Sequence, residues 1–461
     1  MTPPVLPRLS RKWLIFTVTA NGTFMSTLSA GIVNIALPTM SQEFGVSLES
    51  IQLVVSFYLL VLTTLLPVFG KLSDIYSRKW MYLGGFITFG VGALLGALSH
   101  SLLTMLLARG VQGIGSSAMM ATSQALIAQV FHGTSRGKAF GAIGAVVACG
   151  SLAGPAIGGV LIQTWGWKSI FWLSVPIAAI GVWRGLYLIP RFNARKRIKF
   201  DIQGALLYSL MSFMFLFALN TAADRGWTHP LILGAFAASI LFFGGFIYRV
   251  RTARYPFLDV EIFKNPVISI GCTVALLGYL ALFVNTVLLP FYLTEIMGLD
   301  PVQIGLLILP FPVMLAISSA VAGTLNAKWP ARILTTAGFC LIIIATLLFA
   351  FIGRKPSLSY IVLAQLIMGT GSGTFQVPNN NTVVSAAPRG KLGVVASMNA
   401  LARNVGMILG IALSVAIFAA VQNYLNSHGV NAPDAFIGGF QSAMLLGTLA
   451  AAIGAVLSTR R

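Results

Sequence analysis

The sequence predicts an all-α protein that crosses a membrane fourteen times and keeps both chain ends on the cytoplasmic side. Its 461 residues are 57% apolar and only 9% charged, whereas a soluble protein carries roughly 25% charged residues. Many apolar runs are long enough to cross a hydrocarbon core of about 30 Å as a helix, and none has the strong alternation of a membrane barrel. The cations fall in short segments between these runs, and the two halves of the chain weakly repeat each other.

Fourteen segments predict membrane-spanning helices because each combines sufficient length with few charges. The first is too long for the core of a cleavable signal peptide, so we expect it to remain as a helix. The predicted ranges are 13–38, 51–70, 80–99, 103–130, 139–163, 169–189, 202–222, 229–248, 267–294, 302–325, 333–352, 359–384, 395–422 and 437–457.

The positions of the cations test this count, because cytoplasmic loops carry an excess of Lys and Arg. With a cytoplasmic N-terminus, the cytoplasmic segments hold 23 of the 30 Lys and Arg residues and the outer loops hold four. A wrong count would scramble this alternation. The formal charge of +20 therefore reflects membrane topology, and we expect no nucleic-acid binding. The four outer cations are Lys168, Arg225, Arg354 and Lys355.

An internal repeat divides the chain. Residues 107–109 (Leu-Ala-Arg) and 363–365 (Leu-Ala-Gln) are each followed by a Gly-x-Gly and then by Arg-Gly-Lys, at 136–138 and 389–391. Two related six-helix bundles with a substrate site between them are a known transporter architecture. We therefore expect an N-terminal bundle over 1–200, an inserted pair of helices over 201–266 and a C-terminal bundle over 267–461.

The first predicted helix carries three neutral polar residues, Asn21, Ser29 and Asn34. A polar group at membrane depth needs water, ligand or a neighbouring helix as its partner. These residues are candidates for lining a substrate cavity. An interhelical hydrogen bond is the alternative for each of them.

The turn over 70–79 (Gly-Lys-Leu-Ser-Asp-Ile-Tyr-Ser-Arg-Lys) places three cations and one carboxylate between two apolar runs. Asp74 can cap a helix N-terminus or pair with a cation, and both contacts can break when two bundles rock. The alternative is an ordinary positively charged loop with a solvated acid.

Arg109 lies inside the predicted helix 103–130, with Gln112 three residues later on the same face. A centrally placed arginine costs on the order of 2.5–3.5 kcal/mol on insertion scales, so such residues usually face a cavity and have a partner. Arg109 and Gln112 are therefore candidates for coupling or for lining a cavity.

The predicted helix 139–163 carries Gly150, Gly154 and Gly158 at every fourth position. Such a bare stripe lets another helix approach closely. Pro155 removes a backbone hydrogen bond and can kink the helix, and Gly159 follows the stripe. These residues predict tight packing and no chemistry.

The second half offers further cavity candidates: Asn285 in 267–294, Gln376 and Asn380 in 359–384, and Arg403 in 395–422. Asn380 is the middle one of three consecutive asparagines. Consecutive helical residues point about 100° apart, so at most one or two of them reach the same cavity.

The carboxylates are distributed unusually, because none of the ten lies deep in a predicted span. Glu295 lies at the outer end of the range 267–294, and Asp74 lies at the cytoplasmic mouth. Buried arginines without buried acids suit an anionic, zwitterionic or neutral amphiphile better than a bulky cation.

Over nearly its whole length, and most strongly over 20–190, the chain resembles the fourteen-span drug:proton antiporter branch of the major facilitator superfamily. The resemblance implies a conformational latch in the loop, coupling in helix 4, an exporter motif in helix 5 and proton antiport. The chain departs from the helix 1 motif at Ser29, where an Asp is usual, and at Gly31, where a Thr is usual. The matching residues are Gly70, Leu72, Asp74, Arg78 and Lys79; Arg109, Gln112, Gly113 and Gly115; Gly150, Gly154, Pro155, Gly158 and Gly159; and Phe24, Met25, Leu28, Asn34, Ala36, Leu37 and Pro38.

We therefore expect a major facilitator fold and an alternating-access exporter of amphipathic small molecules, monomeric in a plasma membrane such as the bacterial inner membrane. Without an acid at position 29, the remaining proton carriers are Asp74 and Glu295, acting against Arg109. The alternative is a lipid or organic-anion transporter, or a facilitator without proton coupling. An enzyme is not expected, because the sequence has no nucleotide-binding loop, metal-ligand spacing or catalytic triad, and no cofactor or metal is implied.

Overall fold

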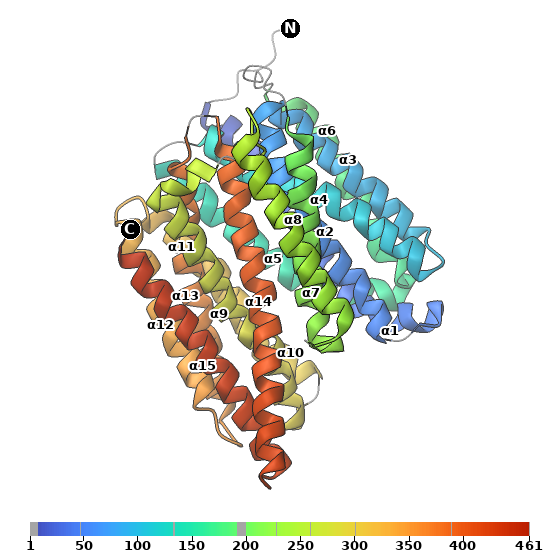
Figure 1. Cartoon of the computed structure of the whole chain (residues 1–461), viewed down its shortest axis with the longest axis vertical. Helices are drawn as coiled ribbons and strands as arrows, with labels where there is room; N and C mark the ends of the chain where they lie inside the picture. The colour runs from blue at the N-terminus through green and yellow to red at the C-terminus, as the bar shows by residue number, and fades with distance from the viewer. Residues whose placement is uncertain are drawn as a thin grey trace.

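The computed structural model describes residues 8–46, 48–131, 134–190, 200–226, 228–258, 260–299, 301–388 and 390–460, and for some residues inside helices it describes the backbone alone. These ranges are almost entirely helical and contain no strand (Figure 1). The helices are α1 (Arg8–Phe44), α2 (Leu48–Ile75), α3 (Arg78–Ala97), α4 (Leu102–Val130), α5 (Thr134–Trp165), α6 (Lys168–Leu188), α7 (Ile202–Arg225), α8 (Pro230–Thr252), the 3-10 helix η1 (Val260–Lys264), α9 (Pro266–Glu295), α10 (Pro301–Ile308), α11 (Pro310–Leu325), α12 (Ala331–Ala350), α13 (Leu358–Ser385), α14 (Leu392–Ser427) and α15 (Ala432–Thr459).

The predicted ranges fall on helices, with one interruption. The range 302–325 is divided into α10 and α11, and Pro310 begins the second helix. Proline has no N–H with which to continue the helical hydrogen bonds of the preceding turn, so one backbone hydrogen bond is missing at this break. Within the described residues, eleven helices are long and apolar enough to cross a membrane, counting α10 and α11 together, and α1, α4 and α5 are not among them. The number of crossings therefore stays a prediction.

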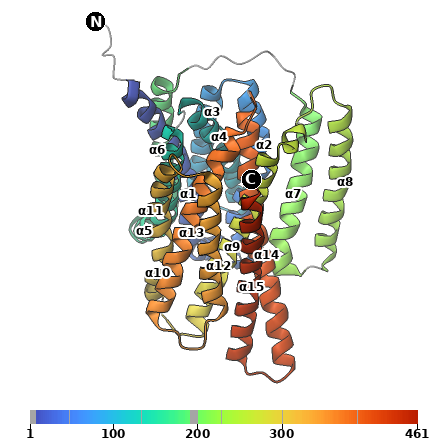
Figure 2. The same ribbon diagram turned by 90° about the vertical axis from the view of Figure 1, so that its left-hand side faces the viewer.

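Contacts divide the helices into two groups and a hairpin. Helices α1–α6 pack mainly on one another, with α3 against α4 and α6, α2 against α4, and α1 against α5. In the second group α14 packs on α9, α13 contacts α11 and α12, and α15 contacts α12 and α9. Helices α7 and α8 form a hairpin at one side of the molecule, where α7 contacts both α2 and α14 (Figure 2). The domain boundaries at 200 and 266 stay predictions.

The two groups meet along two pairs of helices, α2 with α14 and α5 with α11. Helices α4 and α13 each contact the opposite group beside these pairs. A site between the groups is therefore bordered by helices from both halves of the chain.

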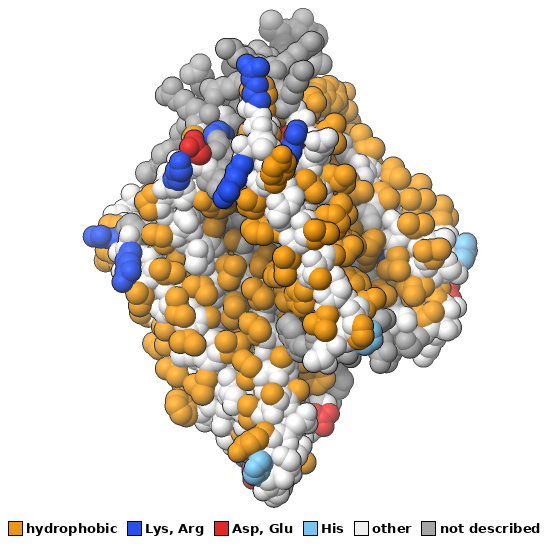
Figure 3. Space-filling model, in the orientation of Figure 1, with side chains coloured by type: hydrophobic (Ala, Val, Ile, Leu, Met, Phe, Trp, Pro, Cys, Tyr) orange, Lys and Arg blue, Asp and Glu red, His pale blue; other side chains and the backbone are white. Residues whose placement is uncertain are grey.

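The surface has two zones. Lys and Arg side chains gather at one end of the molecule, the upper end in Figure 3, and apolar side chains cover much of the surface below it. Large apolar residues are exposed on many helices, including Leu103 at 68% and Tyr187 at 77%. Apolar surface of this extent, on helices of membrane-spanning length, makes the chain a multi-pass membrane protein. We refer to the end with the Lys and Arg side chains as the cation-rich end.

Candidate functional site

Asp74 joins the two groups of helices. It lies in the last turn of α2, and its Oδ1 accepts hydrogen bonds from Arg78 Nη2 at 2.8 Å and from the Gly393 backbone N–H at 2.9 Å. Its Oδ2 accepts a third from the Val394 N–H at 3.0 Å. The first turn of α14 contains no acidic residue, so Asp74 supplies the negative charge that a helix N-terminus favours. One buried carboxylate therefore holds α2, α3 and α14 together.

Gly70 allows α2 and α14 to come this close. A Cβ on Gly70 would lie 2.6 Å from the carbonyl oxygen of Gly393, and a Cβ on Gly393 would lie 2.4 Å from the carbonyl oxygen of Gly70. Both distances are below any normal carbon–oxygen contact, and both involve backbone atoms that cannot swing aside. The two backbones therefore cross with no room for a side chain.

Arg78 and Lys79 are buried, at 9% and 7% exposure. Besides pairing with Asp74, Arg78 donates a hydrogen bond through Nη1 to Gln129 Oε1 of α4. Lys79 Nζ donates to the carbonyl oxygen of Leu186 in α6. These two cations hold the N-terminal group together, and the alternative of a solvated loop does not describe them.

A second junction between the groups involves Arg136, at the start of α5. Its Nε donates to Asn381 Oδ1 of α13 at 3.1 Å, and its Nη2 donates to Ser385 Oγ of the same helix. Nearby, α5 and α11 approach closely at Gly141, where a Cβ would lie 2.6 Å from the carbonyl oxygen of Ser319. The sequence had identified Arg136 only as a loop cation, although its place in the internal repeat was a usable signal.

Arg109 lies fully buried in α4 among neutral groups. Its Nε donates to the carbonyl oxygen of Val54 at 3.0 Å, and its Nη1 donates to Ser29 Oγ and to Gln112 Oε1, both at 2.9 Å. Its guanidinium carbon is 4.1 Å from the centre of the Tyr58 ring, a cation–π contact. No ion pair between described residues includes Arg109.

Two buried hydrogen-bond donors beside Ser29 and Tyr58 are unused. Nη2 of Arg109 and Nε2 of Gln112 have no hydrogen-bond partner among the described residues. Leaving a buried donor without an acceptor costs about 1–3 kcal/mol and more for a charged group. An oxygen acceptor or an anion beside Arg109 and Gln112 would therefore be stabilised.

The second group contains a corresponding polar pair. Asn285 of α9 donates through Nδ2 to Gln365 Oε1 of α13 at 3.4 Å, and its Oδ1 has no partner among the described side chains. Both line a small cavity of about 80 Å³, together with Thr286 and Phe311. Gln365 stands at the position that the internal repeat aligns with Arg109. Sequence reasoning had not named Gln365 as a site residue, although the repeat pointed to it.

Arg403 and Gln376 meet at Tyr279 of α9. The guanidinium carbon of Arg403 is 5.7 Å from the centre of the Tyr279 ring, and the Tyr279 hydroxyl donates to Gln376 Oε1 at 2.7 Å. The next residue on α14, Asn404, donates to Thr63 Oγ1 of α2 at 3.1 Å. This polar cluster therefore borders the contact between the two groups.

The three consecutive asparagines of α13 contact three different helices. Asn379 Nδ2 donates to the carbonyl oxygen of Gly271 in α9 at 3.1 Å, and Asn380 Oδ1 accepts from Asn399 of α14 at 2.6 Å. Asn381 Oδ1 accepts from Arg136 of α5, as described above. An interhelical hydrogen bond therefore accounts for each of the three asparagines.

Three candidates do not contact Arg109, Ser29 or Gln112. They are Asn21, Asn34 and Glu295. Asn21 Nδ2 lies 3.5 Å from the carbonyl oxygen of Ile177 in α6. Asn34 is exposed and donates to the carbonyl oxygen of Ala30 in its own helix at 3.4 Å. Glu295 is exposed at the last residue of α9.

Three of the four glycines in the predicted packing motif of α5 face α1. A Cβ on Gly150 would lie 2.1 Å from Thr27 Oγ1, one on Gly154 would lie 3.1 Å from the Ile32 backbone nitrogen, and one on Gly158 would lie 2.7 Å from Ile32 Cγ1. A Cβ on Gly159 would meet nothing within 4 Å. The side chain of Pro155 lies outside the described part of the structure. The first three glycines therefore make the close packing that their spacing predicts.

Asp201 is a buried acid that directly precedes the predicted range 202–222. Its Oδ1 accepts from the Gly204 N–H at the start of α7 and from Arg249 Nε of α8, both at 3.0 Å, and its Oδ2 accepts from the Phe257 N–H at 3.1 Å. Asp201 thus closes the base of the α7–α8 hairpin. An isolated Asp directly before a helix was the available signal.

Known proteins share this fold and this sequence pattern. The chain is 33% identical over 419 residues to a protein of Clostridioides difficile described as riboflavin transporter RibZ, covering 90% of each chain. It is 28% identical to the tetracenomycin C resistance and export protein of Streptomyces glaucescens, covering 89% of this chain and 76% of that protein. The solved structure of the human organic anion transporter MFSD10 (TETRAN) superimposes with a TM-score of 0.67 at 16% identity, covering 97% of this chain and 99% of that one. The sequence model of one transporter family, the Major Facilitator Superfamily, matches residues 19–411, so this chain belongs to the Major Facilitator Superfamily.

Proposed function

We propose that this protein is an alternating-access exporter of amphipathic small molecules, crossing a bacterial inner membrane fourteen times with both termini in the cytoplasm. The observation that carries the proposal is the position of Asp74, which bonds Arg78 on its own side and the N-terminus of α14 across the interface. Contacts of this kind can break when two rigid groups rotate against each other. The relatives described as multidrug resistance or antibiotic export proteins support the direction of transport.

The surroundings of Arg109 support a substrate that is not a cation. A buried guanidinium with neutral neighbours repels a positively charged ligand and attracts an acceptor or an anion. The unused donors of Arg109 and Gln112 offer two hydrogen bonds to a carbonyl, carboxylate or sulfonate oxygen. We therefore propose neutral, zwitterionic or anionic amphiphiles as substrates.

Proton antiport is the energy source that the resemblance to drug:proton antiporters implies. The usual buried acid of helix 1 is replaced by Ser29, so Asp74 and Glu295 are the proposed proton carriers. Asp74 is the stronger of the two, since its protonation would remove the charge that holds Arg78 and α14.

A second candidate is a carrier of a neutral aromatic compound such as riboflavin, or an organic-anion carrier without proton coupling. The similarity to a protein described as a riboflavin transporter favours this candidate. The absence of a carboxylate near Arg109, among the described residues, agrees with it.

The test is transport by the purified protein in liposomes, with and without an imposed pH gradient, using matched cationic, neutral and anionic fluorescent amphiphiles and also riboflavin. We expect gradient-driven accumulation of the neutral and anionic amphiphiles. Accumulation that is unchanged when the gradient is collapsed would refute antiport, and transport of riboflavin alone would favour the second candidate.

Arg109→Ala is expected to abolish transport of these substrates. Arg184→Ala is the matched control, because Arg184 donates to Thr17 Oγ1 in an exposed position. Full activity of Arg109→Ala would remove Arg109 from the mechanism.

A further inference from the structure

The α7–α8 hairpin borders an apolar groove that opens to the membrane. The groove has a volume of about 340 Å³, and its walls include Phe215 and Leu216 of α7, Ile240 and Phe243 of α8, and Val405 of α14. Ile240 and Phe243 are 72% and 50% exposed, so the groove's outer rim faces the surroundings of the protein. Such a volume lies at the lower end of the range for small-molecule sites, which fits a single alkyl chain.

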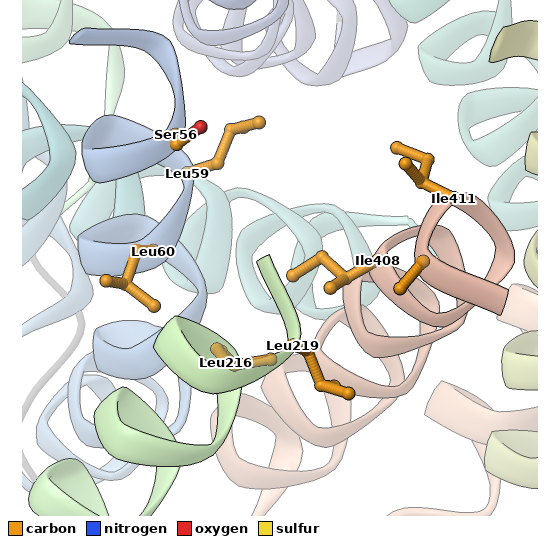
Figure 4. Close-up of a pocket in the computed structure, with 8 residues that line it drawn as sticks. Ser56, Leu59, Leu60, Leu216, Leu219, Ile408 and Ile411 are labelled. Atoms are coloured by element: carbon orange, nitrogen blue, oxygen red, sulfur yellow. The ribbon is translucent and has the colours of Figure 1, made fainter. Parts of the chain in front are cut away.

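The groove adjoins a second cavity at the contact between the two groups of helices. This inner pocket, about 80 Å³, lies where α2, α7 and α14 meet, with Leu59 and Leu60 on α2 and Ile408 on α14 (Figure 4). Leu216 lines both cavities and is only 1% exposed, so its side chain separates the groove from the pocket.

One face of α14 runs along both cavities. Leu401 and Val405 line the groove, and Ile408 and Ala412 line the pocket. Their spacing of four, three and four residues places them in a single stripe along the helix. An apolar chain can therefore follow this stripe from the groove toward the contact between α2 and α14.

The groove also contains polar groups. Tyr208 lines the groove and is 4% exposed, and Ser212, one turn later on α7, lines it as well. Tyr208 follows Asp201 by seven residues, which is about 10 Å along the helix axis. Tyr208 therefore lies on the side of the groove nearer to the Asp201 end of the hairpin.

We propose that the groove, Leu216 and the inner pocket form a lateral entry site for the alkyl chain of a single-chain amphiphile, which reaches the transport pathway from the bilayer. The inference rests on the proposed export of amphipathic molecules and identifies how such a substrate enters. The Tyr208 hydroxyl bonds the polar head, and Leu216 swings aside to admit the chain between the two groups. A lipid with a purely structural role would occupy the groove, but it would not require the inner pocket at the α2–α14 contact.

The first test compares Leu216→Trp with Leu206→Trp, a control at a position of the same helix that is 58% exposed. The probes are anionic fluorescein amides with alkyl chains of about two and about twelve carbons, transported in liposomes. We expect Leu216→Trp to slow the long-chain probe by about tenfold or more and to leave the short-chain probe unchanged. The control should change neither. Equal effects of Leu216→Trp on both probes, or no effect on either, would overturn the proposal.

The second test requires no turnover, so it separates this inference from the proposed function. The long-chain probe, with a diazirine at the chain end, is photolysed with the wild-type protein in liposomes and the labelled peptides are mapped. We expect labelling of residues 211–219 and 401–412, reduced by excess unlabelled probe. Labelling elsewhere overturns the inference, as does labelling of these segments by a diazirine phospholipid that excess probe does not reduce. If the wild-type protein binds the probe here but transports no amphiphile, only the proposed function is refuted.

Discussion

Arg109 donates a hydrogen bond to Ser29 Oγ at 2.9 Å, so a hydroxyl faces a fully buried cation. In the transporters that this chain resembles, the position of Ser29 carries an aspartate. A carboxylate there would neutralise the guanidinium and could exchange a proton. Ser29 does neither, and no ion pair between described residues includes Arg109.

Replacing Ser29 by Asp should change the substrate preference. A carboxylate within hydrogen-bond distance of Arg109 would cancel its attraction for anions, and we expect the ratio of cationic to anionic amphiphile transport to rise by about tenfold or more. Ser29→Asn is the matched control, because asparagine has nearly the same shape as aspartate but no charge. The measurement is transport of charge-matched dyes in liposomes. If Asn and Asp give the same ratio, the charge at this position does not select the substrate.

Neutralising Asp74 should loosen the contact between α2 and α14. Asp74→Asn removes the charge-assisted hydrogen bonds to Arg78 and to the N-terminus of α14, each worth about 1.5–3 kcal/mol. We expect transport to fall by about tenfold or more, and a cysteine placed at the buried Ser397 beside Gly70 to react faster with a maleimide. Glu261→Gln is the control, because Glu261 pairs with Lys264 in an exposed position where pairing contributes little. Unchanged maleimide reactivity in Asp74→Asn would contradict a latch.

The helices themselves were predictable from the sequence, because hydrophobic length and the positions of cations are local features. The partner of each polar side chain was not. Asn380 and Asn381 are neighbours in sequence, yet one bonds α14 and the other α5, since helical geometry turns them about 100° apart. The roles of Asp201 and Arg136 depend on residues tens to hundreds of positions away, which one sequence without relatives cannot identify.

The same limit applies to the glycines. Their spacing predicts a packing stripe that includes Gly158, which touches Ile32, and omits Gly159, which has nothing within 4 Å. The spacing cannot identify α1 as the helix that packs on this stripe. The break between α10 and α11 could not have been predicted from Pro310 alone, because α2, α6, α9 and α13 continue through Pro67, Pro176, Pro290 and Pro378.

Gly70→Ala should separate two backbones that now touch. The new Cβ would lie 2.6 Å from the carbonyl oxygen of Gly393, and overpacking of this kind typically costs about 1–3 kcal/mol. We expect a lower thermal midpoint in detergent and a loss of transport similar to that of Asp74→Asn. Gly159→Ala is the control: it has free space, and Ala is favoured over Gly inside a helix by roughly 0.5–1 kcal/mol, so its thermal midpoint should stay equal or rise. A Gly70→Ala protein as stable and active as the wild type would show that the two backbones can separate freely.

Asp201→Asn should weaken the base of the α7–α8 hairpin before it affects the latch. The carboxylate accepts one hydrogen bond from the Gly204 N–H at the start of α7, one from Arg249 of α8 and one from the Phe257 N–H. Because the side chain of Arg249 is 37% exposed and screened by solvent, most of the loss should come from the two backbone donors, about 1–3 kcal/mol each if left unpaired. We expect faster proteolysis of the segment 252–258 and a lower thermal midpoint in detergent. The maleimide reactivity of a cysteine in place of Ser397, used above to monitor the latch, should stay unchanged. Lys71 Nζ donates to the carbonyl oxygen of Pro256 at 3.3 Å, so the hairpin base also touches the end of α2. Increased reactivity at position 397 in Asp201→Asn would therefore mean that the hairpin and the latch open together, against the independence expected here.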